Sequence, residues 1–166
     1  MKHTLVALVE NEPGVLNRVA SLFRRRNFNI DSLTVGRTES PAVSRMTIVV
    51  DSSVQNTASV EKNLYKLVNV ITVQDVTDTP LITRDMALIK VHAADGVSDM
   101  CHDFGARIID VSSDSVIVEI SDTEDQVEQL VESLRQFGII ELVRTGVVSM
   151  GRGQNILTAQ STTEAI

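Results

Sequence analysis

The sequence has little cysteine, no tryptophan and no long apolar run. Cys101 is the single cysteine among 166 residues, which excludes an internal disulfide and fits a reducing compartment. No apolar run approaches the roughly 18 residues that a membrane span needs. The N-terminal apolar stretch is also too short for a secretory signal peptide. These absences predict a cytoplasmic protein with no membrane partner.

The sequence is also short of positive charge, because its formal net charge at pH 7 is −7. The one basic cluster, Arg24-Arg25-Arg26, falls where a helix is expected to end, and cations there suit the helix dipole. Nucleic-acid binders usually carry a basic stripe or patch. We therefore expect no nucleic-acid partner.

A catalytic or metal-binding constellation is missing as well. The three histidines are scattered, and Cys101, His102 and Asp103 are adjacent on a predicted helix, where neighbours point about 100° apart and cannot chelate together. The carboxylates of residues 122–132 fall on the outer face of the last predicted helix, away from any cleft. We expect no catalytic residue, no metal site and no cofactor in this chain.

The sequence contains the same order of predicted secondary-structure elements in each of its two halves. Aromatic residues make up 3% of the chain, so Val, Ile and Leu must build a core suited to sheet packing. Periodicity predicts strand, helix, strand, strand, helix and strand in each half. The first half has these elements at residues 3–9, 14–26, 29–38, 44–50, 60–68 and 70–76. The second half has them at residues 86–93, 95–105, 107–112, 115–121, 123–134 and 139–150.

This order predicts the α+β fold class, with two ferredoxin-like βαββαβ domains in tandem. Residues 1–78 are expected to form the first domain and residues 84–151 the second. The connector is 79–83, because Pro80 cannot join a central strand. The polar residues 152–166 are expected to be a flexible tail. Strands of the first domain are apolar on both faces, which predicts a partner on the face without helices, most simply a second copy.

The turn ENEPGVLN, residues 10–17, joins the first strand to the first helix. It lacks the glycine pattern and the cation of a phosphate-binding loop, and its glutamates repel phosphate. Exposed N–H groups at the start of a helix suit a carboxylate, and Asn11 can offer its side-chain oxygen to an ammonium or its NH₂ to a carboxylate. Pro13 stiffens the turn. The residues alone leave two interpretations open, a receptor for a small zwitterion and a plain helix entry.

The segments ENEPGVLNRVASLFRRRNFNIDSLTVG and SRMTIVV resemble the N-terminal ACT domain in the family of small, regulatory subunits of acetolactate synthase (acetohydroxyacid synthase). ARIIDVSSDSVIVEISD and FGIIELVRTGVVSMGRG in the second half resemble the same family. The resemblance runs from Lys2 to about Gly153. It implies that the first domain is an ACT domain.

The family resemblance implies a homodimer that binds a branched-chain amino acid, typically valine, where two ACT domains join. The effector is then held by one chain at the first turn and by the other at the start of the second strand. The residues carried over are Asn11, Gly14, Val15 and Leu16 from one chain and Asn29 and Ile30 from the other. Catalysis would belong to a separate large subunit that carries thiamine diphosphate, magnesium and FAD. The small subunit would activate it and confer feedback inhibition.

The second half departs from the receptor pattern, because its equivalent turn, residues 93–96, has neither Asn nor Pro. We therefore expect one type of effector site, and we assign the second domain to dimer packing and to contact with the large subunit. The basic run from Arg144 to Arg152 is a candidate for that contact. Gly14→Asp is expected to remove feedback control by blocking the ligand and placing a negative charge beside its carboxylate.

Two other functions are compatible with the fold. A free-standing tandem ACT sensor could act on another enzyme or on transcription, and the latter would call for a DNA-binding segment. A ferredoxin-like enzyme would need a clustered nucleophile, a metal site or a phosphate loop. The sequence supplies none of these features.

Overall fold

The structure is a computed structural model that describes residues 2–51 and 57–157. The chain divides into two compact units. One unit comprises Met1–Ile82 together with Ser149–Ile166, and the other comprises Thr83–Val148. Within the described residues, no helix is long and apolar enough to cross a membrane.

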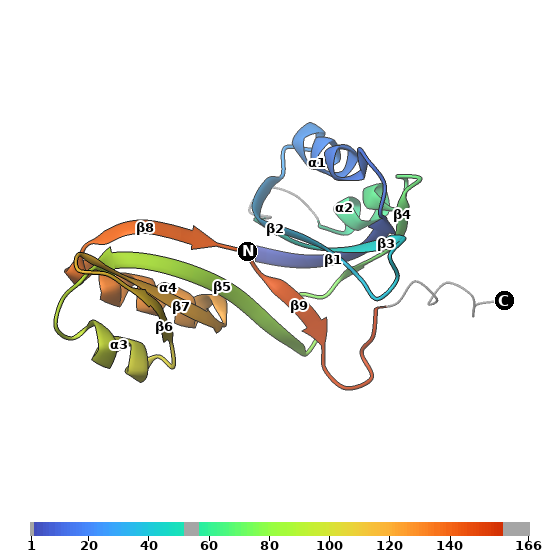
Figure 1. The fold of residues 1–166 in the computed structure, drawn as a ribbon. Helices are drawn as coiled ribbons and strands as arrows, with labels where there is room; N and C mark the ends of the chain where they lie inside the picture. The colour runs from blue at the N-terminus through green and yellow to red at the C-terminus, as the bar shows by residue number, and fades with distance from the viewer. Residues whose placement is uncertain (1, 52–56, 158–166) are drawn as a thin grey trace. The chain divides into compact units, whose positions relative to one another are not determined.

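The first unit is a four-stranded antiparallel sheet with both helices on one face (Figure 1). The strands lie in the order β2-β3-β1-β4, as in a ferredoxin-like fold. The predicted α+β class is therefore confirmed. Its elements are β1 (Lys2–Glu10), α1 (Val15–Arg25), β2 (Asn29–Arg37), β3 (Val43–Asp51), α2 (Thr57–Leu64) and β4 (Val70–Asp75).

The core of this unit forms where the apolar stripe of α1 meets the sheet. Val15, Val19, Leu22 and Phe23 are buried on that stripe. Alternate residues of β1, which share one face of the strand, belong to the same apolar cluster. The predicted amphipathic helix is thus confirmed, and its packing follows from the 3.6-residue period.

The second helix is shorter than expected. It ends at Leu64, and the chain turns there through a hydrogen bond from the N–H of Leu67 to the carbonyl of Leu64 at 3.0 Å. Leu67 still packs against the core, but Val68 is 90% exposed. The expected continuation to residue 68 is wrong, because apolar spacing alone does not show where backbone hydrogen bonding stops.

The first sheet is also buried on its face without helices. Val6 and Leu8, which alternate with the helix-facing residues of β1, are 1% and 3% exposed. The residues around Gly151 to Leu157 belong to this unit, and Leu8 and Leu157 line the same cavity. Residues 152–157, the start of the expected tail, therefore belong to the first unit. Residues 158–166 of that tail lie outside the described residues.

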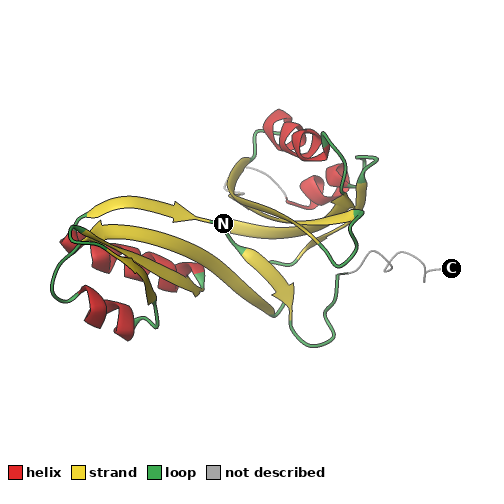
Figure 2. Cartoon of the chain, in the orientation of Figure 1, coloured by secondary structure: helices red, strands yellow, loops and turns green. Residues whose placement is uncertain are grey.

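The second unit repeats the arrangement, with strands in the order β6-β7-β5-β8 and with α3 and α4 on one face of its sheet (Figure 2). Its elements are β5 (Leu81–His92), α3 (Val97–Asp103), β6 (Arg107–Val111), β7 (Ser115–Asp122), α4 (Glu124–Leu134), η1 (Arg135–Phe137) and β8 (Ile139–Arg144). Val127, Leu130, Val131 and Leu134 form the buried face of α4, as the sequence predicts.

Thr123 and Gln126 at the start of α4 have the residue types of a capping box, and this box is half formed. The hydroxyl of Thr123 accepts a hydrogen bond from the N–H of Gln126 at 3.4 Å. The N–H of Thr123 donates to Oδ1 of Asp122 at 2.7 Å, where a capping box would use the Gln126 side chain. The helix begins where predicted, with a different acceptor for one of its capping groups.

The boundary between the two units of the structure differs from the domain boundary that the sequence predicts. β5 begins at Leu81, inside the connector expected at 79–83. The expected last strand, 139–150, is broken after Arg144, where Gly146 has a φ of +84°. The chain resumes as β9 (Val148–Gly151), which pairs with β5, and from Ser149 onward it belongs to the first unit rather than the second.

Candidate effector-binding turn

The turn between β1 and α1 places free backbone donors at the start of a helix. Gly14 is the N-cap of α1, with a left-handed φ of +87°, a conformation that glycine adopts without strain. The N–H of Val15 reaches the carbonyl of Glu12 at 3.5 Å. The N–H groups of Leu16 and Asn17 have no acceptor among the described residues. These donors, at the positive end of the helix, suit a carboxylate.

The side chains of the turn divide between core and solvent. Val15 is 4% exposed and belongs to the core, so its backbone alone can meet a ligand. Leu16 is 46% exposed and offers an apolar surface. A Cβ atom added to Gly14 would meet no other atom within 4 Å. The space in front of this glycine is therefore open to a ligand.

Asn11 is held in place by the hairpin between β2 and β3. Its N–H donates to the carbonyl of Ala42 at 2.8 Å, and its side-chain Nδ2 donates to the carbonyl of Pro41 at 3.0 Å. This contact uses one of the two N–H groups of the amide and leaves the second N–H and Oδ1 for a ligand. Both roles that the sequence allows for Asn11 therefore stay open, acceptance from an ammonium by Oδ1 and donation to a carboxylate by the second N–H.

The side chains of Arg18, Asn69 and Glu10 form a hydrogen-bonded chain beside the turn. Nη1 of Arg18 donates to Oδ1 of Asn69 at 2.5 Å, and Nδ2 of Asn69 donates to Oε2 of Glu10 at 2.6 Å. The N–H of Glu10 also donates to the carbonyl of Asn69 at 2.9 Å. Asn69 is 7% exposed, so it fixes the end of β1 against the start of β4. Sequence reasoning missed this residue, because its partners are distant along the chain.

Asn29 and Ile30 lie at the opposite end of the same sheet. Glu10 pairs with Val43 at one end of β3, whereas Asn29 pairs with Asp51 at the other. The eight-residue separation along β3 corresponds to about 26 Å. Asn29 is exposed and Ile30 packs partly against the core. The structure therefore brings Asn11, Gly14, Val15 and Leu16 together and leaves Asn29 and Ile30 apart from them within one chain.

The second unit contains an equivalent turn before α3. Gly96 is left-handed, with a φ of +94°, and the N–H of Met100 bonds to its carbonyl just as the N–H of Arg18 bonds to that of Gly14. The two turns differ in their surroundings, because a Cβ on Gly96 would lie 3.6 Å from Cζ of Phe137. An aromatic ring thus borders the second glycine, whereas the first is open.

No metal centre is formed by the described residues, which contain no group of three or more His, Cys, Asp and Glu side chains able to hold an ion. Cys101, the candidate thiol, is 3% exposed, and burial raises its pKa. A buried thiol with a raised pKa is a poor nucleophile.

Comparison with known proteins agrees with this organisation. Residues 5–72 match the family model described as the AHAS small subunit-like ACT domain, and residues 84–153 match the one described as the small subunit of acetolactate synthase. The chain is 50% identical over 157 residues to a probable acetolactate synthase small subunit of Archaeoglobus fulgidus, covering 92% of this chain and 98% of that one. It is 48% identical to the acetolactate synthase small subunit of Mycobacterium leprae, covering 91% and 92%.

A solved structure shows the same fold. The crystal structure of the acetolactate synthase small subunit from Thermotoga maritima matches with a TM-score of 0.84 at 39% identity, covering 92% of this chain and 98% of that one. The class is therefore that of proteins with an ACT domain followed by a second unit of the same α+β kind. Within this class, the chain belongs to the family of acetolactate synthase small subunits. The family resemblance seen in the sequence is confirmed.

Proposed function

We propose that this chain is a regulatory subunit that binds a branched-chain amino acid, with valine as the principal effector, at the junction of two ACT domains. The observation that carries the proposal is the placement of the candidate residues at opposite ends of one sheet. A site that uses both groups has to be completed by a second chain.

The edge strand β2 offers the means of joining two chains. β2 is the edge strand on one side of the sheet, and five of its nine residues are exposed. Two copies that pair antiparallel along β2 would place Asn29 of one chain beside Arg37 of the other. Arg37 pairs with Ser44, at the end of the sheet where Glu10 pairs with Val43 and the effector turn begins. One two-fold axis would thus create two equivalent sites.

Each group of the effector then has a partner. The carboxylate would accept hydrogen bonds from the N–H groups of Leu16 and Asn17, where the helix dipole adds a favourable field. The ammonium would donate to Oδ1 of Asn11. The branched alkyl group would lie between Leu16 of one chain and Ile30 of the other, which favours an apolar side chain over a charged one.

The partner in regulation would be the large catalytic subunit of acetolactate synthase, as the names of the relatives suggest. Thiamine diphosphate, magnesium and FAD would reside on that subunit. In the basic run from Arg144 to Arg152, Arg144 is paired with Asp85 and Glu128, and Nε of Arg152 donates to the carbonyl of Leu81, which makes this run a weaker candidate for the contact.

Thermal unfolding of the purified chain with valine, leucine, isoleucine or aspartate tests the effector site. A ligand at 100 times its dissociation constant adds about 2.7 kcal/mol per site. For a chain of this size the melting temperature should rise by roughly 5–10 °C. A rise confined to the branched-chain amino acids, together with a dimer in light scattering, supports the proposal. No rise for the chain alone and none after reconstitution with a large subunit would contradict it.

A further inference from the structure

A cavity of about 500 Å³ lies in the first unit on the face of the sheet opposite α1. It is bordered by the β2–β3 hairpin and by residues 150–157, and we call it the hairpin cavity. Leu8 lines it, and Leu8 alternates along β1 with Ala7 and Val9, which face the helices. The cavity therefore lies on the face of the sheet that α1 does not cover, although the hairpin that borders it also contacts Asn11 of the effector turn.

The cavity wall combines apolar side chains with three charged residues, Arg37, Glu39 and Arg45. Leu8, Val43, Met150, Ile156 and Leu157 supply the apolar surface. Arg45, which pairs with Leu8 across β1 and β3, is the only charged residue in an otherwise uncharged strand segment, residues 43–50. The exposed Arg37 and Glu39 stand on the hairpin beside it.

Arg45 has few partners for a half-buried cation. Its Nη2 donates to the carbonyl of Ser149 at 2.7 Å, and it forms no ion pair with any carboxylate in residues 2–51 and 57–157. Burial lowers the pKa of Arg45, since the charge is partly removed from water. A partly desolvated charge is costly unless an opposite charge meets it. The remaining guanidinium donors are thus available to an anion that enters the cavity.

We propose that the hairpin cavity binds a small organic anion, a carboxylate on a short unbranched or branched apolar body, with Arg45 as its counter-ion. The guanidinium fork would hold the carboxylate, and the body would cover Leu8, Val43 and Ile156. This ligand would be separate from the amino-acid effector, because Arg45 alternates along β3 with Met46, which faces the helices, and so lies on the face of the sheet that α1 does not cover.

Hexanoate and hexanamide are matched probes, because they differ chiefly in charge. Methyl NMR of the full-length wild-type chain should show hexanoate shifting the signals of Leu8, Val43, Met150 and Ile156 in a saturable way. Hexanamide and inorganic phosphate should bind at least about tenfold more weakly, the first for lack of charge and the second for lack of an apolar body. Equal binding of hexanoate and either control would overturn the proposal. So would shifts centred on Leu16, which would place the probe at the effector turn.

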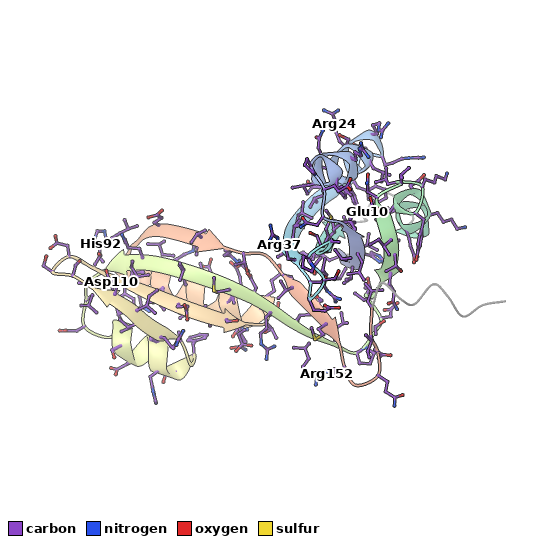
Figure 3. The ribbon with its side chains drawn as sticks, turned by 45° about the vertical axis from the view of Figure 1, so that its right-hand side comes forward. Glu10, Arg24, Arg37, His92, Asp110 and Arg152 are labelled. Atoms are coloured by element: carbon purple, nitrogen blue, oxygen red, sulfur yellow. The ribbon has the colours of Figure 1, made fainter. Side chains whose placement is uncertain are left out.

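Variants of Arg45 give a second readout. Arg45→Gln keeps the length and a donor but removes the charge, and should weaken hexanoate at least about tenfold, whereas Arg45→Lys should retain part of the affinity. Arg24→Gln is the matched control, because Arg24 projects into solvent from the far side of α1 (Figure 3). Unchanged hexanoate binding in Arg45→Gln would overturn the proposal. If a variant fails to fold, the comparison of hexanoate, hexanamide and phosphate on the wild-type chain still tests the proposal. Neither the NMR result nor the variant result depends on whether valine binds at the effector turn.

Discussion

Arg144 donates two hydrogen bonds to the same carboxylate oxygen of Asp85, from Nε at 2.8 Å and from Nη2 at 2.5 Å. The Asp85 side chain is 2% exposed, and its other oxygen, Oδ1, has no partner among the described residues. Burial alone lowers the pKa of Arg144, but hydrogen bonds and charges from Asp85 and Glu128 outweigh it and raise that pKa. This pair fixes β8 to β5 in the second unit, and its loss should be costly.

We expect Arg144→Met to lower the free energy of unfolding by about 3–5 kcal/mol, because it leaves the buried carboxylate of Asp85 without its cation. Glu128→Gln, which removes the half-exposed second partner, should cost less than about 1 kcal/mol. Replacing both buried partners, as Asp85→Leu with Arg144→Met, should recover most of the loss. Urea unfolding at pH 7 measures all three. Equal stability of Arg144→Met and Glu128→Gln would contradict the importance of burial.

The proposed effector site predicts that a negative charge at position 14 weakens valine binding. Gly14→Asp and Gly14→Asn introduce side chains of nearly equal size, and both residues tolerate the left-handed conformation better than others do. Asp adds a negative charge beside the donors of Leu16 and Asn17, so we expect it to weaken valine binding at least about tenfold more than Asn does. Isothermal titration with valine measures this difference. Valine binding to Gly14→Asp at wild-type affinity would exclude the turn as the receptor.

The repeated βαββαβ order could be predicted because each element carries its own local signal. Val127, Leu130, Val131 and Leu134 fall on one stripe, and the structure buries all four. The turn before the first helix could be predicted as well, since Pro13 and Gly14 are turn residues at the start of an apolar helical stripe. These features depend on neighbours within a few residues, which a single sequence displays directly.

Other features depend on residues far apart in the chain, and the sequence could not display them. The carbonyl of Pro80 accepts a hydrogen bond from the N–H of Arg152 at 3.0 Å, and this contact belongs to the segment expected to be a flexible tail. The ring of Phe137 borders Gly96 from 41 positions along the chain, and it distinguishes a closed turn from the open one at Gly14. The support of the effector turn by Asn69 was hidden for the same reason.

The proposed dimer makes a prediction about β2. Val35, which is 41% exposed on this edge strand, would lie at the junction of two chains. Val35→Lys should weaken the dimer at least about tenfold, because a charge on an edge strand opposes pairing with another strand. Val68→Lys is the matched control, since Val68 is 90% exposed and precedes β4 at the other edge of the sheet. Sedimentation equilibrium compares the two, and an unchanged dimer in Val35→Lys would exclude β2 as the interface.

The burial of Cys101 predicts that the stability of the chain falls as the pH rises into the alkaline range. Burial raises the pKa of its thiol in the native state, whereas an unfolded cysteine ionises near about pH 8.5. As the pH rises past that value, the unfolded thiol loses its proton while the native thiol keeps it, so the unfolded state is favoured. The contribution of Cys101 to stability is thus fully present at neutral pH and lost in alkali.

Urea unfolding between pH 7 and pH 10 should therefore show wild type losing more stability than Cys101→Ala, whose other titrating groups are the same. The native thiol should also react with a disulfide reagent at pH 8 at least about 100-fold more slowly than the urea-unfolded chain, because reaction requires local opening of α3 and its surroundings. Parallel pH curves for the two proteins, or a native thiol that reacts as fast as the unfolded one, would show that Cys101 is accessible to solvent. In that case α3 would open readily, and the second unit would be less rigid than its buried core indicates.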